Sequence, residues 1–264
     1  MNVIKQEYPL VVAHRGASGI TPENTLAAFK RAAAQGADMI ELDVRMTKDF
    51  HVVVHHDQTI RRTTGGRGAI WDLTLQQIRN LDAGRWFHSR FSGQQIPTLR
   101  QALEAIPSHM GVNIEVKTDG DSRKKLAFEE VTILIIMEKR CVDRVLVSSF
   151  DHSFIARVKK LFPEIRTGSL SHPIRDRRRK PSTLARKLKT DAFICDRAFL
   201  TADFVADAHA RNLLVGSYVI NTKAELETAV SLGVDAIVTD FPGRIVPALR
   251  RMGIRNPKPK QSGE

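Results

Sequence analysis

Short apolar runs rich in β-branched residues recur along the chain, and most of them alternate with stretches whose apolar positions have a helical period. Eight such runs are visible, at 9–14, 39–44, 112–116, 144–150, 165–170, 192–196, 213–220 and 235–240. The helical patterns are clearest at 24–36, 128–140, 154–162, 202–212 and 224–233. Strand alternating with helix predicts a parallel sheet, and eight such units in about 250 residues predict a closed (β/α)8, or TIM, barrel.

One segment, 47–97, interrupts this alternation. It contains the apolar run HVVVHHD, a glycine turn at 65–66 and the aromatic stretch GRWFHSRFSG. We interpret it as a small insertion between the second strand and the second helix, lying over the mouth of the barrel. The sequence as a whole predicts a single catalytic domain over 1–254, followed at 255–264 by a polar, proline-bearing tail that we expect to be disordered.

The second apolar run carries two carboxylates. Glu41 and Asp43 are two residues apart, so on a strand they share one face, while Ile40, Leu42 and Val44 occupy the other. Two like charges desolvated together are costly, and the usual remedies are a cation, a shared proton or a basic partner. A simple salt-bridged strand end is the alternative explanation for this pair taken alone.

The next run repeats the pattern, with Asn113, Glu115 and Lys117 on one face of the strand. Because the active sites of TIM barrels lie at the carboxyl ends of the strands, Glu115 should join Glu41 and Asp43 at the mouth. Three carboxylates from neighbouring strands form an all-oxygen site. Such a site suits one hard divalent cation, Mg²⁺ or Ca²⁺, better than zinc.

Cationic and imidazole side chains follow the apolar runs toward the same mouth. His14 and Arg15 end the first run, and Arg15 together with Lys117 supplies the cations that phosphate oxygens favour. His55 and His56 follow the apolar run of the insertion, and one of them should face inward. Two histidines beside a metal and a phosphate could serve as general acid and base.

The segment after Arg15 leads from the first strand into the first helix. Thr21 is a candidate N-cap for that helix, with Pro22 in the first turn. This pattern predicts a helix that begins immediately after Thr21.

Composition and charge narrow the class of protein. The 264 residues are 42% hydrophobic, enough to bury a large core, and no apolar run approaches the roughly 20 residues of a membrane span. The start MNVIKQEYPLVV has neither a signal-like apolar core nor a cleavage site, so we expect a cytoplasmic protein. A net charge of +12 favours anionic partners: phosphates, nucleic acid or anionic lipid. The two cysteines, Cys141 and Cys195, are predicted to be buried free thiols.

Several short motifs occur in a fixed order along the chain. They are HRG (14–16), PENT (22–25), ELDV (41–44), HD (56–57) with RTT (62–64), IPTL (96–99), IEVK (114–117), SSF (148–150) and VTDFP (238–242). Each is weak alone. In this order and spacing, over nearly the whole chain, they resemble the glycerophosphodiester phosphodiesterase family, in particular its bacterial cytoplasmic type.

This resemblance implies a TIM barrel with the small insertion, one divalent cation, and hydrolysis of a small-molecule glycerophosphodiester to sn-glycerol 3-phosphate and an alcohol. Carried over position by position, it makes His14 and His56 the catalytic acid/base pair, and it selects His56 over His55 because the family's histidine precedes an aspartate. The metal ligands that it implies are Glu41, Asp43 and Glu115, and the phosphate contacts are Arg15 and Lys117.

The resemblance also extends to YVIN at 218–221, where Tyr218 keeps an aromatic ring that can pack on the glycerol moiety. Val219 replaces the threonine usual in the family, which could loosen the match to glycerol. Arg100 stands where the family usually has glutamate, on what we expect to be the outer surface of the second helix, away from the site.

Two rival functions come from different classes. A non-catalytic binder of phosphorylated lipids or nucleic acid would explain the charge, but such a binder should lack the site, so no nucleic acid partner is expected. A lysophospholipase D or sphingomyelinase D type phosphodiesterase shares the barrel and much of the metal constellation, and head-group preference would separate it from the first reading. The sequence leaves open the alcohol released, the attacking group, which histidine is the acid, and the oligomeric state.

The segment 175–189 carries eight basic residues and one acidic residue, Asp176. It follows the fifth strand, which places its start on the same face as the metal site. A solvated surface is the simplest reading, and a weak contact with an anionic membrane is the alternative hypothesis.

Overall fold

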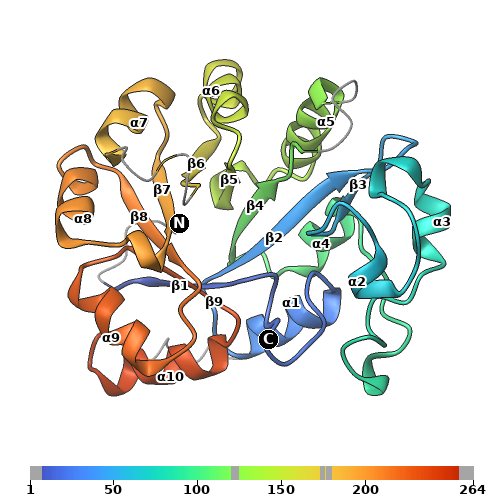
Figure 1. The fold of residues 1–264 in the computed structure, drawn as a ribbon, viewed down its shortest axis with the longest axis horizontal. Helices are drawn as coiled ribbons and strands as arrows, with labels where there is room; N and C mark the ends of the chain where they lie inside the picture. The colour runs from blue at the N-terminus through green and yellow to red at the C-terminus, as the bar shows by residue number, and fades with distance from the viewer. Residues whose placement is uncertain (1–7, 120–124, 173–175, 177–179, 256–264) are drawn as a thin grey trace.

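The computed structural model describes residues 8–119, 125–172, 176 and 180–255. Within them, eight parallel strands form the barrel: β1 (Leu10–Ala13), β2 (Met39–Met46), β4 (Gly111–Val116), β5 (Val145–Ser149), β6 (Arg166–Leu170), β7 (Ala192–Asp196), β8 (Leu214–Tyr218) and β9 (Ala236–Thr239). The sheet closes on itself because β1 pairs with both β2 and β9 (Figure 1). The predicted TIM barrel is confirmed.

A helix follows each barrel strand and packs on the outside of the barrel (Figure 1). These helices are α1 (Leu26–Ala34), α4 (Leu99–Ala105), α5 (Lys125–Glu138), α6 (His152–Leu161), α7 (Pro181–Leu188), α8 (Ala202–His209), α9 (Lys223–Ser231) and α10 (Pro242–Arg251). Short 3-10 turns precede β5 at η4 (Val142–Arg144) and follow β7 at η5 (Arg197–Phe199). Apolar residues on the outer faces of the strands and the inner faces of the helices form the main core.

The first helix begins later than the sequence predicts. Thr25 is its N-cap and accepts a hydrogen bond from the Ala28 amide, whereas the Thr21 hydroxyl donates to Ala17 O at 2.7 Å. The prediction of Thr21 as the cap was therefore wrong, because this threonine bonds backward into the turn that leaves the strand.

The predicted insertion between β2 and α4 is present, but it lies beside the barrel and not over its mouth as predicted. It consists of β3 (Val52–Val54), α2 (Arg61–Thr64), η1 (Ile70–Asp72), α3 (Leu75–Arg79) and η2 (Ser89–Phe91). β3 pairs antiparallel with β2, and Figure 1 shows the other elements as a lobe beside that edge of the barrel. The lobe has a small core of its own, formed by Val53, Ile60, Ile70, Ile78, Ala83 and Ile96.

The interior of the barrel changes from apolar to charged along the direction of the strands. On β2 the inward positions run from Met39 through Glu41 to Asp43, and on β4 from Asn113 to Glu115. Near the amino ends of the strands the interior is filled by aliphatic side chains, which include Leu10, Val12, Leu146, Ile194 and Val238. Alternation places these side chains on the inner face of the barrel, and their positions along the strands place the charged ones toward the carboxyl end.

Arg255, the first residue of the predicted tail, is buried and donates to Asp38 Oδ1 at 2.8 Å and to Gly36 O at 2.9 Å. The remainder of that tail, 256–264, lies outside the described residues, as does most of the basic loop at 173–179. In the portion that is described, no helix is long and apolar enough to cross a membrane. Cys141 and Cys195 are buried and free, as predicted.

Candidate active site

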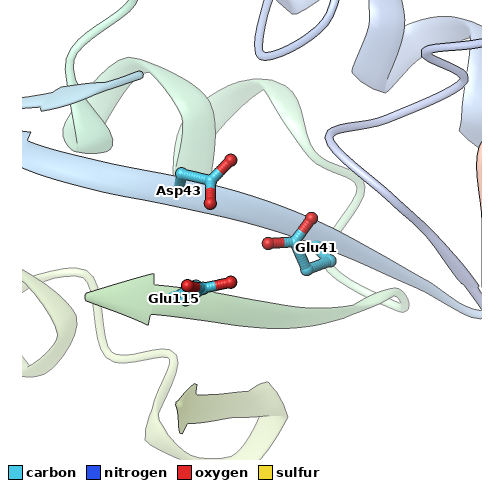
Figure 2. A group of neighbouring side chains, drawn as sticks. All are labelled: Glu41, Asp43 and Glu115. Carbon is cyan, nitrogen blue, oxygen red and sulfur yellow. The ribbon is translucent and has the colours of Figure 1, made fainter. Parts of the chain in front are cut away.

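Three carboxylates meet at the carboxyl ends of neighbouring strands. Glu41 and Asp43 extend from β2 and Glu115 from β4, and the three point toward one another (Figure 2). One oxygen from each lies within 4.8 Å of the others. The β2–β4 register pairs Asp43 directly with Glu115, so the parallel sheet itself enforces their approach.

Two cations partly balance these carboxylates. Lys117 Nζ contacts Asp43 Oδ1 at 3.0 Å and also bonds Glu115 Oε1. The backbone amide of Arg15 donates to Glu41 Oε2 at 2.8 Å, and its Nε lies 3.3 Å from Asp43 Oδ2. Carboxylates outnumber cations at this buried site, because Arg15 also pairs with Glu23.

This imbalance acts most strongly on Glu41, which keeps its proton to a higher pH than an ordinary carboxyl group. Burial and the neighbouring Asp43 raise the pKa of Glu41 to about 8. Burial alone would raise the pKa of Asp43 as well, but Lys117 and Arg15 outweigh it and hold that pKa well below its usual range. The pKa of Glu115 is raised, chiefly by burial.

The donor set fits a hard divalent cation. Glu41 Oε1 is buried and has no hydrogen-bond partner among the described residues, and the same is true of Asn113 Oδ1 on the adjacent strand. An unpaired buried oxygen costs free energy unless a ligand satisfies it. The residues present therefore match the oxygen coordination that Mg²⁺ and Ca²⁺ require.

His14 lies just beyond β1 and is held by a carboxylate from the other end of the chain. Its Nδ1 lies 2.7 Å from Asp240 Oδ1, and Asp240 also accepts from Ser18 Oγ at 2.9 Å and from Asn221 Nδ2 at 2.7 Å. Burial opposes the charged form of His14, but the bond to Asp240 prevails and its pKa is raised. A carboxylate acceptor at Nδ1 places the proton there and leaves Nε2 as the reactive nitrogen of the neutral ring.

His56 follows β3 and has a carboxylate partner of the same kind. Its Nδ1 lies 2.7 Å from Asp57 Oδ1, and its backbone carbonyl accepts from Arg45 Nε at 2.8 Å. Burial lowers the pKa of His56. His55 instead is buried away from the mouth, with Nε2 3.1 Å from Thr59 O.

The turn after β1 requires unusual backbone conformations. Gly16 has a φ of +83°, and a Cβ there would lie 2.7 Å from the backbone of Ala28 on α1. Arg15 and Asn24 are also left-handed, at φ 53° and 56°, and the Asn24 amide donates to Asp43 Oδ2 at 2.9 Å. The HRG and PENT motifs thus fold the turn that carries Arg15 and a partner of Asp43 to the mouth.

These side chains surround a cavity of about 320 Å³. Of the residues predicted for the site, all but the buried Asp43 line this cavity: His14, Arg15, Glu41, His56, Glu115, Lys117 and Tyr218. The cavity is also lined by the apolar side chains of Phe150, Leu170 and Val219, and by Asp196 and Arg197. The phenol of Tyr218 donates to Ser171 O at 3.3 Å, and burial raises its pKa.

Several residues that shape the site have no role in the sequence prediction. They are Asp240 and Asp57, which hold the histidines, and Glu23 and Arg62, which connect Asp57 to Arg15. All four lie inside motifs that the sequence displays, VTDFP, HD, PENT and RTT. The motifs mark these four residues, but only the folded chain shows which side chain each residue contacts.

An acidic, histidine-flanked mouth on a TIM barrel, with an arginine and a lysine beside it, is the site of an enzyme that acts on an anionic ester. The glycerophosphoryl diester phosphodiesterase family model matches residues 14–244. The chain therefore belongs to this family, and it is an enzyme of that class.

The match to individual relatives extends over nearly the whole length of each. The chain is 38% identical to the glycerophosphodiester phosphodiesterase of Caldanaerobacter subterraneus subsp. tengcongensis, covering 92% of this chain and 99% of that protein. It is 37% identical to a putative glycerophosphodiester phosphodiesterase of Bacillus subtilis, covering 89% and 96%. An Oleispira antarctica phosphodiesterase, solved in complex with the product sn-glycerol-3-phosphate, is 31% identical with a TM-score of 0.83, covering 92% and 97%.

Proposed function

We propose that this chain hydrolyses glycerophosphodiesters to sn-glycerol 3-phosphate and an alcohol, with a divalent cation, Mg²⁺ or Ca²⁺, held by Glu41, Asp43 and Glu115. The observation that carries the proposal is the buried carboxylate group itself, with its excess negative charge and the unpaired oxygen of Glu41. The product bound to the Oleispira antarctica relative supports sn-glycerol 3-phosphate as the phosphorylated product.

The metal, when bound, would neutralise the phosphate and activate a water molecule or a substrate hydroxyl. His14 and His56 supply the proton transfers. Each ring presents Nε2 while its Nδ1 is fixed by a carboxylate, so one histidine takes the proton of the nucleophile and the other protonates the leaving alkoxide.

Arg15 and Lys117 bind the phosphoryl oxygens. Both line the cavity and both stay charged, since the pKa of each is raised by the carboxylates beside it despite burial. Their charges stabilise the negative charge that builds up on the phosphate in the transition state. Tyr218, which also lines the cavity, offers an aromatic face to the glycerol carbons.

Release of glycerol 3-phosphate from a panel of glycerophosphodiesters tests the reaction. For lysophospholipids and sphingomyelin, whose cleavage by a D-type enzyme yields no free glycerol 3-phosphate, release of the head-group alcohol is measured instead, and Mg²⁺, Ca²⁺ or a chelator is added to each substrate. Turnover of water-soluble diesters and not of the lipids is expected. Preference for the lipids would indicate an enzyme of the lysophospholipase D or sphingomyelinase D type instead. Full turnover after exhaustive chelation would refute the role of the metal.

Direct titration tests the metal ligands without relying on activity. Glu41→Gln keeps the size of the side chain and removes its charge, so calorimetric binding of Mg²⁺ or Ca²⁺ should be lost together with turnover. Glu227→Gln, at an exposed glutamate on α9, is the matched control and should preserve both. Unchanged metal affinity in Glu41→Gln would contradict the assignment.

We also infer a cytoplasmic location and the domain limits 1–254, on the sequence arguments given above. The two buried free cysteines are compatible with a reducing compartment. Contact between the basic segment 175–189 and an anionic membrane remains a hypothesis, since its arginines at 177–179 are outside the described residues.

A further inference from the structure

Arg62, on α2 of the insertion, joins two carboxylates that come from different loops. Its Nε and Nη2 donate to the two oxygens of Asp57 at 2.7 and 3.0 Å. Its Nη1 and Nη2 donate to the two oxygens of Glu23, both at 2.7 Å. Bidentate pairs of this kind fix direction as well as adding energy, so a single guanidinium sets the orientation of both carboxylates.

Each of these carboxylates in turn holds one residue of the site. Asp57 Oδ1 accepts from His56 Nδ1 at 2.7 Å, and Glu23 Oε1 accepts from Arg15 Nη1 at 2.9 Å. We propose that Arg62 is a positioning residue that orients His56 through Asp57 and Arg15 through Glu23. The inference rests on the proposed function, because it takes His56 as a proton-transfer group and Arg15 as a phosphate contact.

Charge balance favours this role. Arg62 donates to both Glu23 and Asp57, whereas without it these two carboxylates would share no cation and would repel each other. The Trp86 ring of the insertion lies 5.7 Å from the Arg62 guanidinium carbon. The insertion therefore takes part in the site through Arg62, besides standing beside the barrel.

The two arms of this network predict a separation of kinetic effects. Asp57→Asn should lower kcat more than it changes KM, because Asp57 contacts His56 directly and reaches Arg15 only through Arg62 and Glu23. Glu23→Gln should raise KM, because it releases the phosphate-binding arginine. Arg62→Ala should do both, lowering kcat/KM about 10- to 100-fold, the range typical when the partner that orients an active-site side chain is removed.

Chemical rescue supplies a readout that a merely structural residue would not affect. The Arg62 side chain is 42% exposed, so a guanidinium ion from solution can reach the space that Arg62→Ala leaves. Guanidinium far below denaturing concentrations should restore part of the lost kcat, whereas sodium at equal ionic strength should not. Arg62→Lys keeps the charge without the planar fork, so its kcat should stay below wild type, and it replaces the alanine variant if that variant fails to fold.

Three controls complete the experiment. Arg61→Ala changes an exposed arginine of the same short helix and should keep wild-type kinetics. Thermal melts establish that each variant is folded at the assay temperature. His56→Ala and Arg15→Ala test the proposed function separately, and wild-type kinetics in both would refute that function and with it the positioning role of Arg62.

Two outcomes would overturn the role of Arg62 while the proposed function stands. One is wild-type kcat and KM in folded Arg62→Ala and Arg62→Lys. The other is a loss of activity that follows the unfolded fraction in the melts and that guanidinium does not reverse.

Discussion

Replacing Asp240 with asparagine should inactivate the enzyme while leaving it folded. All three groups that contact this carboxylate donate to it: His14 Nδ1 and Ser18 Oγ at Oδ1, and Asn221 Nδ2 at Oδ2. An amide has only one oxygen, so in either orientation its NH₂ group faces a donor. If it faces Asn221, an unsatisfied pair costs about 1–3 kcal/mol of stability.

If the amide NH₂ faces His14 instead, the ring must accept at Nδ1 and carry its proton on Nε2. The reactive nitrogen is then in the wrong protonation state for a base. The equivalent change in serine proteases lowers kcat by about 10⁴. We therefore expect a loss in kcat of about 10²- to 10⁴-fold, or about 3–5 kcal/mol of transition-state stabilisation.

Steady-state kinetics and a thermal melt measure the two effects separately. Ser18→Ala is the matched control, because it removes one donor and leaves the carboxylate in place, which should cost about 0.5–1.5 kcal/mol. A folded Asp240→Asn enzyme whose kcat stays within the range of Ser18→Ala would refute the argument that this carboxylate sets the state of His14.

Three further predictions follow from burial and charge. His56→Ala should lower kcat at least about 10²-fold, whereas His55→Ala should mainly lower thermal stability, and the reverse order at equal stability would show that the roles are exchanged. Burial raises the pKa of Cys195 to about 12, so neither it nor Cys141 should react with a thiol reagent at pH 8 until denaturant is added. Replacing Arg177, Arg178 and Arg179 with glutamine should raise KM at low salt and leave kcat unchanged, because salt screens the positive charge of this segment. Kinetics across ionic strength, with vesicle co-sedimentation alongside, measure the effect, and an unchanged KM at low salt would contradict the prediction.

Much of the barrel could be predicted because its signals are local. The alternation of apolar runs located all eight barrel strands to within a few residues, and the period-two pattern placed Glu41 and Asp43 on one face. The residues at which the helices begin were harder to predict from the sequence. Thr21 and Thr25 are both plausible caps by type, and the choice depends on whether the hydroxyl of Thr21 bonds backward to Ala17, which only the folded turn determines.

The partners of the site residues were not accessible from local pattern. His14 and Asp240 are 226 residues apart, and no local signal joins a histidine after the first strand to an aspartate after the last. The same holds for Arg62 on α2 and Glu23 in the turn before α1, which are 39 residues apart. Strand alternation predicts which way a side chain points, but its partners follow from how the strands are arranged around the barrel.

The pairing of the first strand with the last has a consequence for the synthesis of the protein. A nascent chain that has emerged as far as β4 already contains the three carboxylates, yet the aspartate that orients His14 is added only with β9. Until that strand docks against β1, the chain contains the proposed cation ligands but lacks the carboxylate that orients His14. We therefore expect that chains released before Asp240 is added do not hydrolyse the diesters, because His14 then lacks the carboxylate that orients it.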